Sequence, residues 1–194
     1  MRRYFYSIDQ VILRRLLFRH LPEPKLRELL ERIIASGAGL YRRADVIQWL
    51  GWDGPGRPGA GLPIGNLTSQ FWGNVYLSEL DHIVCRALRV PWYQRYMDDF
   101  TLFSDDAEEL LVARERIGAW LAQERHLELK DPGARPERTD HQLHYLGYEV
   151  TRGGLRLGPK ARGRMPERLG AAVDDPKRLT ASITSYAAAW KFGQ

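Results

Sequence analysis

The segment Tyr96-Met97-Asp98-Asp99 places two adjacent carboxylates between two short aromatic runs, 92–96 and 100–103. This pattern predicts a β-hairpin with the acidic pair near its turn. Neighbouring carboxylates repel each other unless cations bind there, and oxygen ligands suit Mg²⁺. Two such ions can hold the attacking and leaving oxygens of an in-line phosphoryl transfer. Taken alone, however, an Asp-Asp pair is more simply explained as a common turn dipeptide.

Three further segments contain residue types that can hold a ligand. The segment 61–70 reads Gly-Leu-Pro-Ile-Gly-Asn-Leu-Thr-Ser-Gln, in which glycine permits a close backbone approach and the polar side chains offer hydrogen bonds. The segment 145–148 reads Tyr-Leu-Gly-Tyr, and the segment 4–9 reads Tyr-Phe-Tyr-Ser-Ile-Asp. Each alone has an ordinary interpretation: a loop entering a helix, a strand with a glycine, and a helix start with Asp9 as its N-cap.

In this order, the four segments resemble the catalytic motifs of reverse transcriptases, and together they cover almost the whole chain. The resemblance implies an RNA-directed DNA polymerase in which Asp98 and Asp99 are catalytic and bind Mg²⁺, with two ions in the complete enzyme. Of the two carboxylates, Asp98 is the one expected to bind Mg²⁺ directly. The implied nucleotide- and template-binding residues are Phe5, which excludes a 2′-hydroxyl, with Ile64, Gly65, Ser69, Gln70, Tyr96 and Met97. The implied primer-supporting residues are Tyr145, Leu146, Gly147 and Tyr148.

The partners that the resemblance implies are a template RNA, a DNA primer or RNA/DNA duplex, and deoxynucleoside triphosphates, with a retroelement accessory protein as a further candidate. Where many reverse transcriptases have Gln-Gly-x-x-x-Ser-Pro, residues 64–70 read Ile-Gly-Asn-Leu-Thr-Ser-Gln. This variant is similar to the bacterial and phage enzymes of diversity-generating retroelements, and retron, group II intron and unclassified bacterial enzymes are close alternatives. It implies a cytoplasmic, bacterial, error-prone enzyme, with Ile64 and Gln70 as the positions that affect fidelity.

The sequence departs from the family pattern at its start. In the family, a metal-binding aspartate precedes the aromatic residue at the Phe5 position by five residues, which corresponds to one residue before Met1. The preceding fingers segment is also missing, so we expect a truncated chain that is inactive or nearly so by itself. An internal methionine taken as the start is favoured, because segments 61–148 look undamaged. The alternatives are a non-catalytic nucleic-acid-binding remnant and a subunit completed by another chain. Lys130 is the nearest match to a lysine that often follows the catalytic hairpin, but its register is too loose to assign general-acid chemistry.

Basic residues are concentrated towards the C-terminus. Residues 151–194 contain 9 of the 29 basic and 3 of the 24 acidic residues, which leaves 20 basic and 21 acidic residues in 1–150. Such a tail can bind phosphates without reading sequence, although a solvated face is the simpler interpretation of this feature alone. With the resemblance, we expect contacts to the nucleic-acid backbone from Lys160, Arg162 and Arg164.

The remaining patterns define the fold class. The single cysteine, Cys85, excludes an intrachain disulfide and a multi-cysteine zinc site, and no apolar run reaches the roughly 18 residues of a membrane span. We therefore expect no membrane partner. Helices are predicted around 13–17, 26–34, 67–90 and 110–121, a loop over 51–62, and a second hairpin whose strands, 143–150 and 155–157, flank Gly153-Gly154. This mixture indicates an α+β fold. The resemblance implies a right-hand polymerase palm over 1–150, an antiparallel sheet backed by helices, followed by the start of a helical thumb over 151–194.

Overall fold

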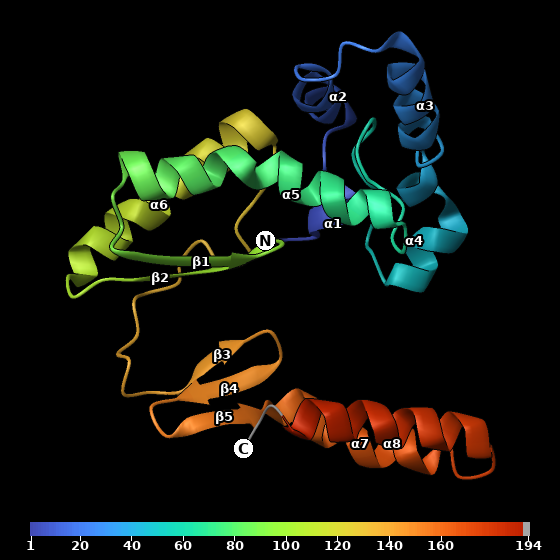
Figure 1. The fold of residues 1–194 in the computed structure, drawn as a ribbon, viewed down its shortest axis with the longest axis vertical. Helices are drawn as coiled ribbons and strands as arrows, with labels where there is room; N and C mark the ends of the chain where they lie inside the picture. Colours follow the sequence, from blue (N-terminus) through green and yellow to red (C-terminus); the bar gives the residue numbers. More distant parts are fainter. Residues whose placement is uncertain (192–194) are drawn as a thin grey trace. The chain divides into compact units, whose positions relative to one another are not determined.

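The computed structural model describes residues 1–191, and the chain divides after Pro136 into two compact units. The first unit, Met1–Pro136, contains the acidic hairpin and the glycine-rich loop, and the second, Glu137–Gln194, contains the second hairpin and the basic helices (Figure 1). Each unit is described by itself below. The functional division into a palm over 1–150 and a thumb over 151–194 stays a prediction.

Helices make up most of the first unit, and side chains fix where several of them begin. Asp9 accepts hydrogen bonds from the backbone N–H groups of Val11 (2.8 Å) and Ile12 (3.1 Å), which starts α2 (Gln10–Phe18). Asp106 caps α6 (Ala107–Arg125) by accepting from the Glu108 N–H at 2.8 Å. The other helices of this unit are α1 (Tyr4–Ser7), α3 (Pro24–Ala35), the 3-10 turn η1 (Leu40–Arg42), α4 (Ala44–Leu50), α5 (Leu67–His82) and the π-helical η2 (Ile83–Ala87).

A two-stranded hairpin lies alongside α5 and α6 (Figure 1). Its strands, β1 (Trp92–Tyr96) and β2 (Asp99–Phe103), pair antiparallel from Trp92↔Phe103 to Tyr96↔Asp99. Alternate side chains of a strand point to one face, and Tyr93, Phe100 and Leu102 pack against the core on that side. The core itself is formed by fully buried side chains that include Ile8, Leu13, Leu62, Tyr76, Leu77, Leu80, Val84, Ile117 and Leu121.

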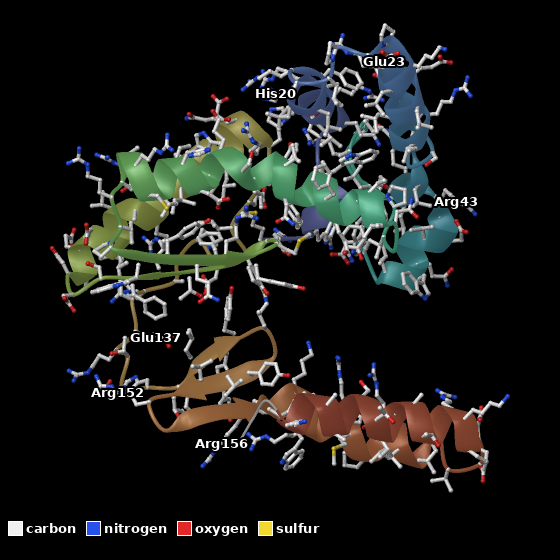
Figure 2. The ribbon with its side chains drawn as sticks, viewed as in Figure 1. His20, Glu23, Arg43, Glu137, Arg152 and Arg156 are labelled. Atoms are coloured by element: carbon white, nitrogen blue, oxygen red, sulfur yellow. The ribbon has the colours of Figure 1, made fainter. Side chains whose placement is uncertain are left out.

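The second unit consists of a three-stranded antiparallel sheet and two helices. The strands β3 (Leu143–Tyr145), β4 (Tyr148–Thr151) and β5 (Gly154–Leu157) pair in sequence order. The helices α7 (Pro159–Gly170) and α8 (Pro176–Lys191) lie side by side (Figure 1). Arg152 lies at the β4–β5 turn and Arg156 on β5, both exposed (Figure 2). Basic side chains therefore occur on the sheet as well as on the helices of this unit.

The structure confirms the α+β class, the predicted helices, the loop over 51–62 and the first hairpin. One strand prediction is wrong: residues 143–150 form two strands rather than one. The chain reverses at Leu146 (φ 51°) and Gly147 (φ 84°), and positive φ at two successive residues makes the tight turn that joins paired strands. Among the helices of residues 1–191, none is long and apolar enough to cross a membrane.

Candidate active site

The acidic pair lies where the first hairpin turns. Tyr96 and Asp99 are the last paired residues, so Met97 and Asp98 form a two-residue turn. Met97 has a φ of 56°, and a left-handed backbone costs about 1–2 kcal/mol for a residue with a side chain. Arg95 offsets part of this cost by donating a hydrogen bond from Nη1 to the Met97 carbonyl at 2.9 Å. The turn is therefore held in a strained conformation by a neighbouring side chain, a feature common at functional sites.

Arg95 also fixes the hairpin to α5. Its guanidinium forms an ion pair with Asp81 at 2.5 Å and donates to the Asn74 amide oxygen at 3.0 Å. The Asn74 amide nitrogen in turn lies 3.1 Å from the Met97 sulfur. Bidentate guanidinium–carboxylate pairs are directional, so these contacts define how the turn is placed on the helix.

The two carboxylates of the turn have different surroundings. Asp98 is half-buried, whereas Asp99 is exposed. Burial raises the pKa of the Asp98 carboxyl above its usual value, and the Met1 ammonium partly opposes this shift. That ammonium lies 3.6 Å from the Asp98 carboxylate and donates a hydrogen bond to the Asp98 carbonyl at 3.2 Å. Asp98 is thus the carboxylate whose environment favours a neighbouring positive charge.

Gly73, in the middle of α5, is the meeting point of the turn and the N-terminal segment. A Cβ at this position would lie 3.2 Å from ring carbons of both Tyr4 and Phe5 and 3.4 Å from the Met97 methyl group. The Tyr4 hydroxyl donates to the Gly73 carbonyl at 2.5 Å. Phe5 and Met97, which the resemblance implies as nucleotide-binding residues, therefore approach the same face of one helix.

The start of α5 presents the other predicted nucleotide-binding residues. Ile64, Gly65 and Gln70 are exposed, and Gly65 has a φ of 98°, which only glycine adopts readily. Gln70 precedes Asn74 by one helical turn, about 6 Å along the axis, and Asn74 contacts Met97. Ser69 instead points into the core, where its Oγ has no hydrogen-bond partner among residues 1–191. Gln70 therefore lies on the same helix as Asn74, which contacts the Met97–Asp98 turn, whereas Ile64 and Gly65 lie in the loop before that helix.

The predicted primer-supporting residues form the β3–β4 turn of the second unit. Tyr145 pairs with Tyr148 across Leu146 and Gly147. The Gly158 N–H donates to the Gly147 carbonyl at 2.8 Å, and a Cβ on Gly158 would lie 2.7 Å from that oxygen. The glycine at 158 therefore allows α7 to begin directly against the turn. The role of this turn in supporting a primer stays a prediction.

The three basic residues predicted to contact a nucleic-acid backbone all lie on α7, but they differ in their contacts. Lys160 and Arg164 are exposed. Arg162 forms an ion pair at 3.0 Å with Glu149, a carboxylate on β4 that is only 5% exposed. Arg162 therefore has a structural partner within its own unit, whereas Lys160 and Arg164 extend towards solvent.

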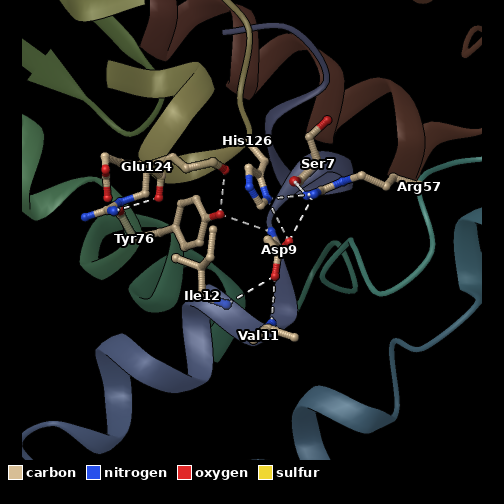
Figure 3. A network of polar contacts seen from close by, with 9 residues as sticks. Ser7, Asp9, Val11, Ile12, Arg57, Tyr76, Glu124 and His126 are labelled. Carbon is tan, nitrogen blue, oxygen red and sulfur yellow. Dashed lines mark hydrogen bonds and ion pairs between the residues drawn. The ribbon is translucent and has the colours of Figure 1, made fainter. Parts of the chain in front are cut away.

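A polar network joins Asp9 to Arg57, His126 and Tyr76, three residues that the sequence analysis did not single out (Figure 3). The Asp9 carboxylate lies 3.0 Å from the Arg57 guanidinium and 3.0 Å from His126 Nδ1, in addition to capping α2. Although burial opposes it, hydrogen bonds from His126 and the α2 backbone, together with Arg57, hold the pKa of the Asp9 carboxyl below its usual range. The Tyr76 hydroxyl accepts from the Asp9 N–H and donates to the Arg125 carbonyl, at 3.2 and 2.7 Å.

Only the N-cap role of Asp9 was readable in advance, and the structure confirms it. Arg57 lies in a Gly/Pro-rich loop, and His126 follows a helix end, positions that carry no local signal for a shared contact.

The chain matches no protein-family model and no curated protein. A functional assignment therefore depends on the residues and geometry described above.

Proposed function

We propose that this chain contributes the palm of an RNA-directed DNA polymerase, with Asp98 at the centre of nucleotidyl transfer. The observation that carries the proposal is the convergence of Phe5, Met97 and Gly73 beside the Asp98 turn. Phe5 and Met97 lie far apart in the sequence and belong to two of the segments that resemble reverse transcriptase motifs. Gly73 lies on α5, three residues after a third segment, 61–70. A chance resemblance would give no reason for the segments to meet.

The donor set at the turn is of the kind that Mg²⁺ uses. Mg²⁺ in proteins is usually bound by one or two carboxylates together with substrate phosphates, and Asp98 with the adjacent Asp99 offers such oxygens. Bound Mg²⁺ would neutralise negative charge on the reacting phosphates. Asp98 is the stronger candidate ligand, because its half-buried carboxylate carries a raised pKa that a neighbouring cation would lower again.

The chain's other residues would bind and orient the substrates. The Phe5 ring, set against Gly73, would close the sugar side of a nucleotide pocket, and the exposed Ile64 and Gln70 would contact the nucleotide and template base. Arg95 would hold the Met97 turn in place while substrate binds. The finer proposal, an error-prone enzyme of the diversity-generating retroelement type, depends on Ile64 and Gln70 alone.

A second candidate function is nucleic-acid binding without catalysis. Lys160 and Arg164 extend from α7 towards solvent and would contact a phosphate backbone without any metal ion.

Primer extension on an RNA template with Mg²⁺ distinguishes the two functions. The chain is compared with a longer version that also contains the residues encoded in frame upstream of the Met1 codon. We expect synthesis only by the extended chain, its loss in Asp98→Ala, and retention in Asp105→Ala, which removes an exposed carboxylate outside the turn. Nucleic-acid binding without synthesis by either chain would favour the non-catalytic function, and synthesis that survives Asp98→Ala would refute the assigned role of Asp98.

A further inference from the structure

A cavity of about 370 Å³ lies in the first unit, and none of the predicted catalytic or nucleotide-binding residues lines it. Phe5 and Tyr6 are adjacent on α1, yet Phe5 approaches Gly73 whereas Tyr6 packs edge-to-face against Tyr41 and Trp52, with ring centroids 4.7 and 5.0 Å away. The cavity is on the Tyr6 side. Its lining is formed by Arg2, Arg3, Tyr6, Ser7, Trp52 and Arg57, with Pro55, Gly56, His126 and Glu128.

The lining is positively charged. Three arginines, Arg2, Arg3 and Arg57, line the cavity together with a single carboxylate, Glu128, so the formal charge of these four residues is +2. Asp9, which pairs with Arg57, lowers the local sum to +1. The Arg2–Glu128 pair is long, at 3.5 Å, and both of its side chains are largely exposed. An exposed pair of this kind contributes little, so an anionic ligand can displace Glu128 from Arg2 at small cost.

Arg3 is held over an aromatic ring by a strained backbone. Its φ of 49° and ψ of 43° are left-handed, which is unfavourable for any residue with a Cβ. Its guanidinium carbon lies 4.2 Å from the centroid of the Trp52 ring, within the range of a cation–π interaction. Strained residues often mark ligand-binding positions. Here the strain places a cation and an aromatic surface next to each other at the cavity wall.

The Arg57 guanidinium is held in place by neighbouring groups of the protein. Its Nη1 lies 3.0 Å from the Asp9 carboxylate and 2.8 Å from His126 Nδ1, and its Nη2 donates to the Ser7 carbonyl at 3.2 Å (Figure 3). The hydrogen bonds that Arg57 donates to Asp9 and to the Ser7 carbonyl fix the guanidinium before any ligand arrives. A preorganised cation binds an anion with a smaller loss of side-chain entropy than a free one.

We propose that this cavity binds a nucleotide, with its phosphate on the guanidinium groups and its base against Trp52 and Tyr6. Guanidinium groups bind phosphate oxygens through paired hydrogen bonds, and aromatic side chains stack on any of the bases. The combination of both in a cavity of this size suits a nucleoside monophosphate better than a bare anion or an apolar molecule. The same chemistry would hold a free nucleotide or one unit of a single strand. The proposal does not depend on the polymerase function, because no candidate catalytic residue lines the cavity.

The test uses the indole N–H signals of the whole 194-residue chain in a nitrogen–proton correlation spectrum. The chain has six tryptophans, and the signal lost in Trp52→Leu belongs to Trp52. Titration with AMP should move that signal and leave the signal of Trp49, an 83% exposed side chain outside the cavity, in place. A Trp52 signal that stays fixed at millimolar AMP overturns the proposal.

Matched variants separate the cavity from other basic surfaces. Arg3→Gln should weaken AMP binding roughly tenfold, as expected for the loss of one charge-assisted contact. Arg43→Gln is the control, since Arg43 is an exposed arginine at the start of α4 that pairs with Asp45 (Figure 2). Equal affinities in the two variants would overturn the proposal.

A fluorescein-labelled single-stranded oligoadenylate identifies the source of the nucleotide. If Arg3→Gln weakens the binding of both AMP and the oligonucleotide, and the two ligands compete with each other, both bind in this cavity. The ligand with the higher affinity is then the occupant. Oligonucleotide binding that is unaffected by both Arg3→Gln and Trp52→Leu would belong to another surface and would refute the strand. Asp98→Asn should change none of these affinities. A failure of the nucleotide-cavity proposal can therefore be distinguished from a failure of the polymerase proposal.

Discussion

Asp98 lies in an environment that opposes its own ionisation. Burial raises the pKa of its carboxyl, and the neighbouring Asp99 adds to this shift, while the Met1 ammonium opposes it. A group whose pKa is raised on folding stabilises the protein below its unfolded pKa, and this contribution is lost as the pH rises through the folded value. At neutral pH the ionised Asp98 therefore costs stability, which is the pattern expected of a residue retained for function.

We predict that Asp98→Asn raises the melting temperature at pH 7, because asparagine carries no charge to desolvate. The gain should shrink as the pH falls towards the ordinary aspartate pKa of 3.8, where the wild-type carboxyl becomes protonated. Thermal unfolding at pH 7 and pH 5 measures both effects, with Asp105→Asn as an exposed control. A lower melting temperature for Asp98→Asn at pH 7 would show that the ammonium contact outweighs the burial cost.

Gly73 is required for space rather than for backbone conformation. We predict that Gly73→Val destabilises the first unit by about 2 kcal/mol, because its added carbons would press on the rings of Tyr4 and Phe5. Gly118→Val on α6 should cost less, since the nearest atom there is the movable end of the Leu129 side chain at 3.3 Å. Urea unfolding compares the two. A smaller loss at Gly73 than at Gly118 would show that α1 and the Met97 turn yield easily.

At the scale of elements, α2 depends on a cap that also connects it to distant segments. Asp9 accepts from two N–H groups of α2 and pairs with Arg57 and His126. The pKa of Asp9 is lowered on folding, so its contribution is present above the unfolded pKa of about 3.8 and is lost as the pH falls through the lower folded value. One carboxylate thus stabilises a helix start, the glycine-rich loop and the end of α6.

We predict that Asp9→Ala costs about 2 kcal/mol at neutral pH, from the lost cap and the unpaired Arg57. Asp9→Asn should cost less, because asparagine caps helices about as well as aspartate. The difference between wild type and Asp9→Ala should narrow below pH 4, which urea unfolding across pH would measure. Equal losses in the two variants would mean that the ion pairs, and not the cap, carry the effect.

The contact between α7 and β4 gives a second prediction at this scale. Arg162→Ala should destabilise the second unit by about 2 kcal/mol, because Glu149 would stay buried without its partner. Arg164→Ala, on the exposed side of the same helix, should leave stability unchanged. Hydrogen exchange of the β4 amides measures the difference. If neither variant changes protection, Glu149 reaches water without Arg162.

At the scale of the whole molecule, the chain consists of two compact units joined by a long irregular segment. Residues 126–142, between α6 and β3, contain no helix or strand and are mostly exposed. Exposed segments without regular structure are the usual sites of proteolytic cleavage.

We predict that brief trypsin treatment cuts first after Lys130 or Arg138, both exposed within this segment. Arg135 should resist cleavage because Pro136 follows it. Mass spectrometry of the early fragments would identify the cut sites, and two fragments that persist would correspond to the two units. First cuts within α5 or α6 would contradict the division.

The sequence by itself determined the features that depend on neighbouring residues. The first hairpin, the cap at Asp9 and the helices could be predicted because alternation, capping and helical spacing act within a few residues. The strand prediction over 143–150 failed because Leu146 is not a typical residue for a left-handed turn, so the reversal had no clear local signal.

Only the tertiary structure decided which distant residues meet. Asp9 is 48 residues from Arg57 and 117 from His126, and no local pattern links them. Arg125, a charged residue that sequence alone would leave in solvent, is 1% exposed because the Tyr76 carbonyl and Glu79 accept from its guanidinium, which lies over the Trp120 ring. The same holds for Phe5, Gly73 and Met97. Such contacts depend on how whole helices pack, and packing is settled by the combined burial of many side chains rather than by any one segment.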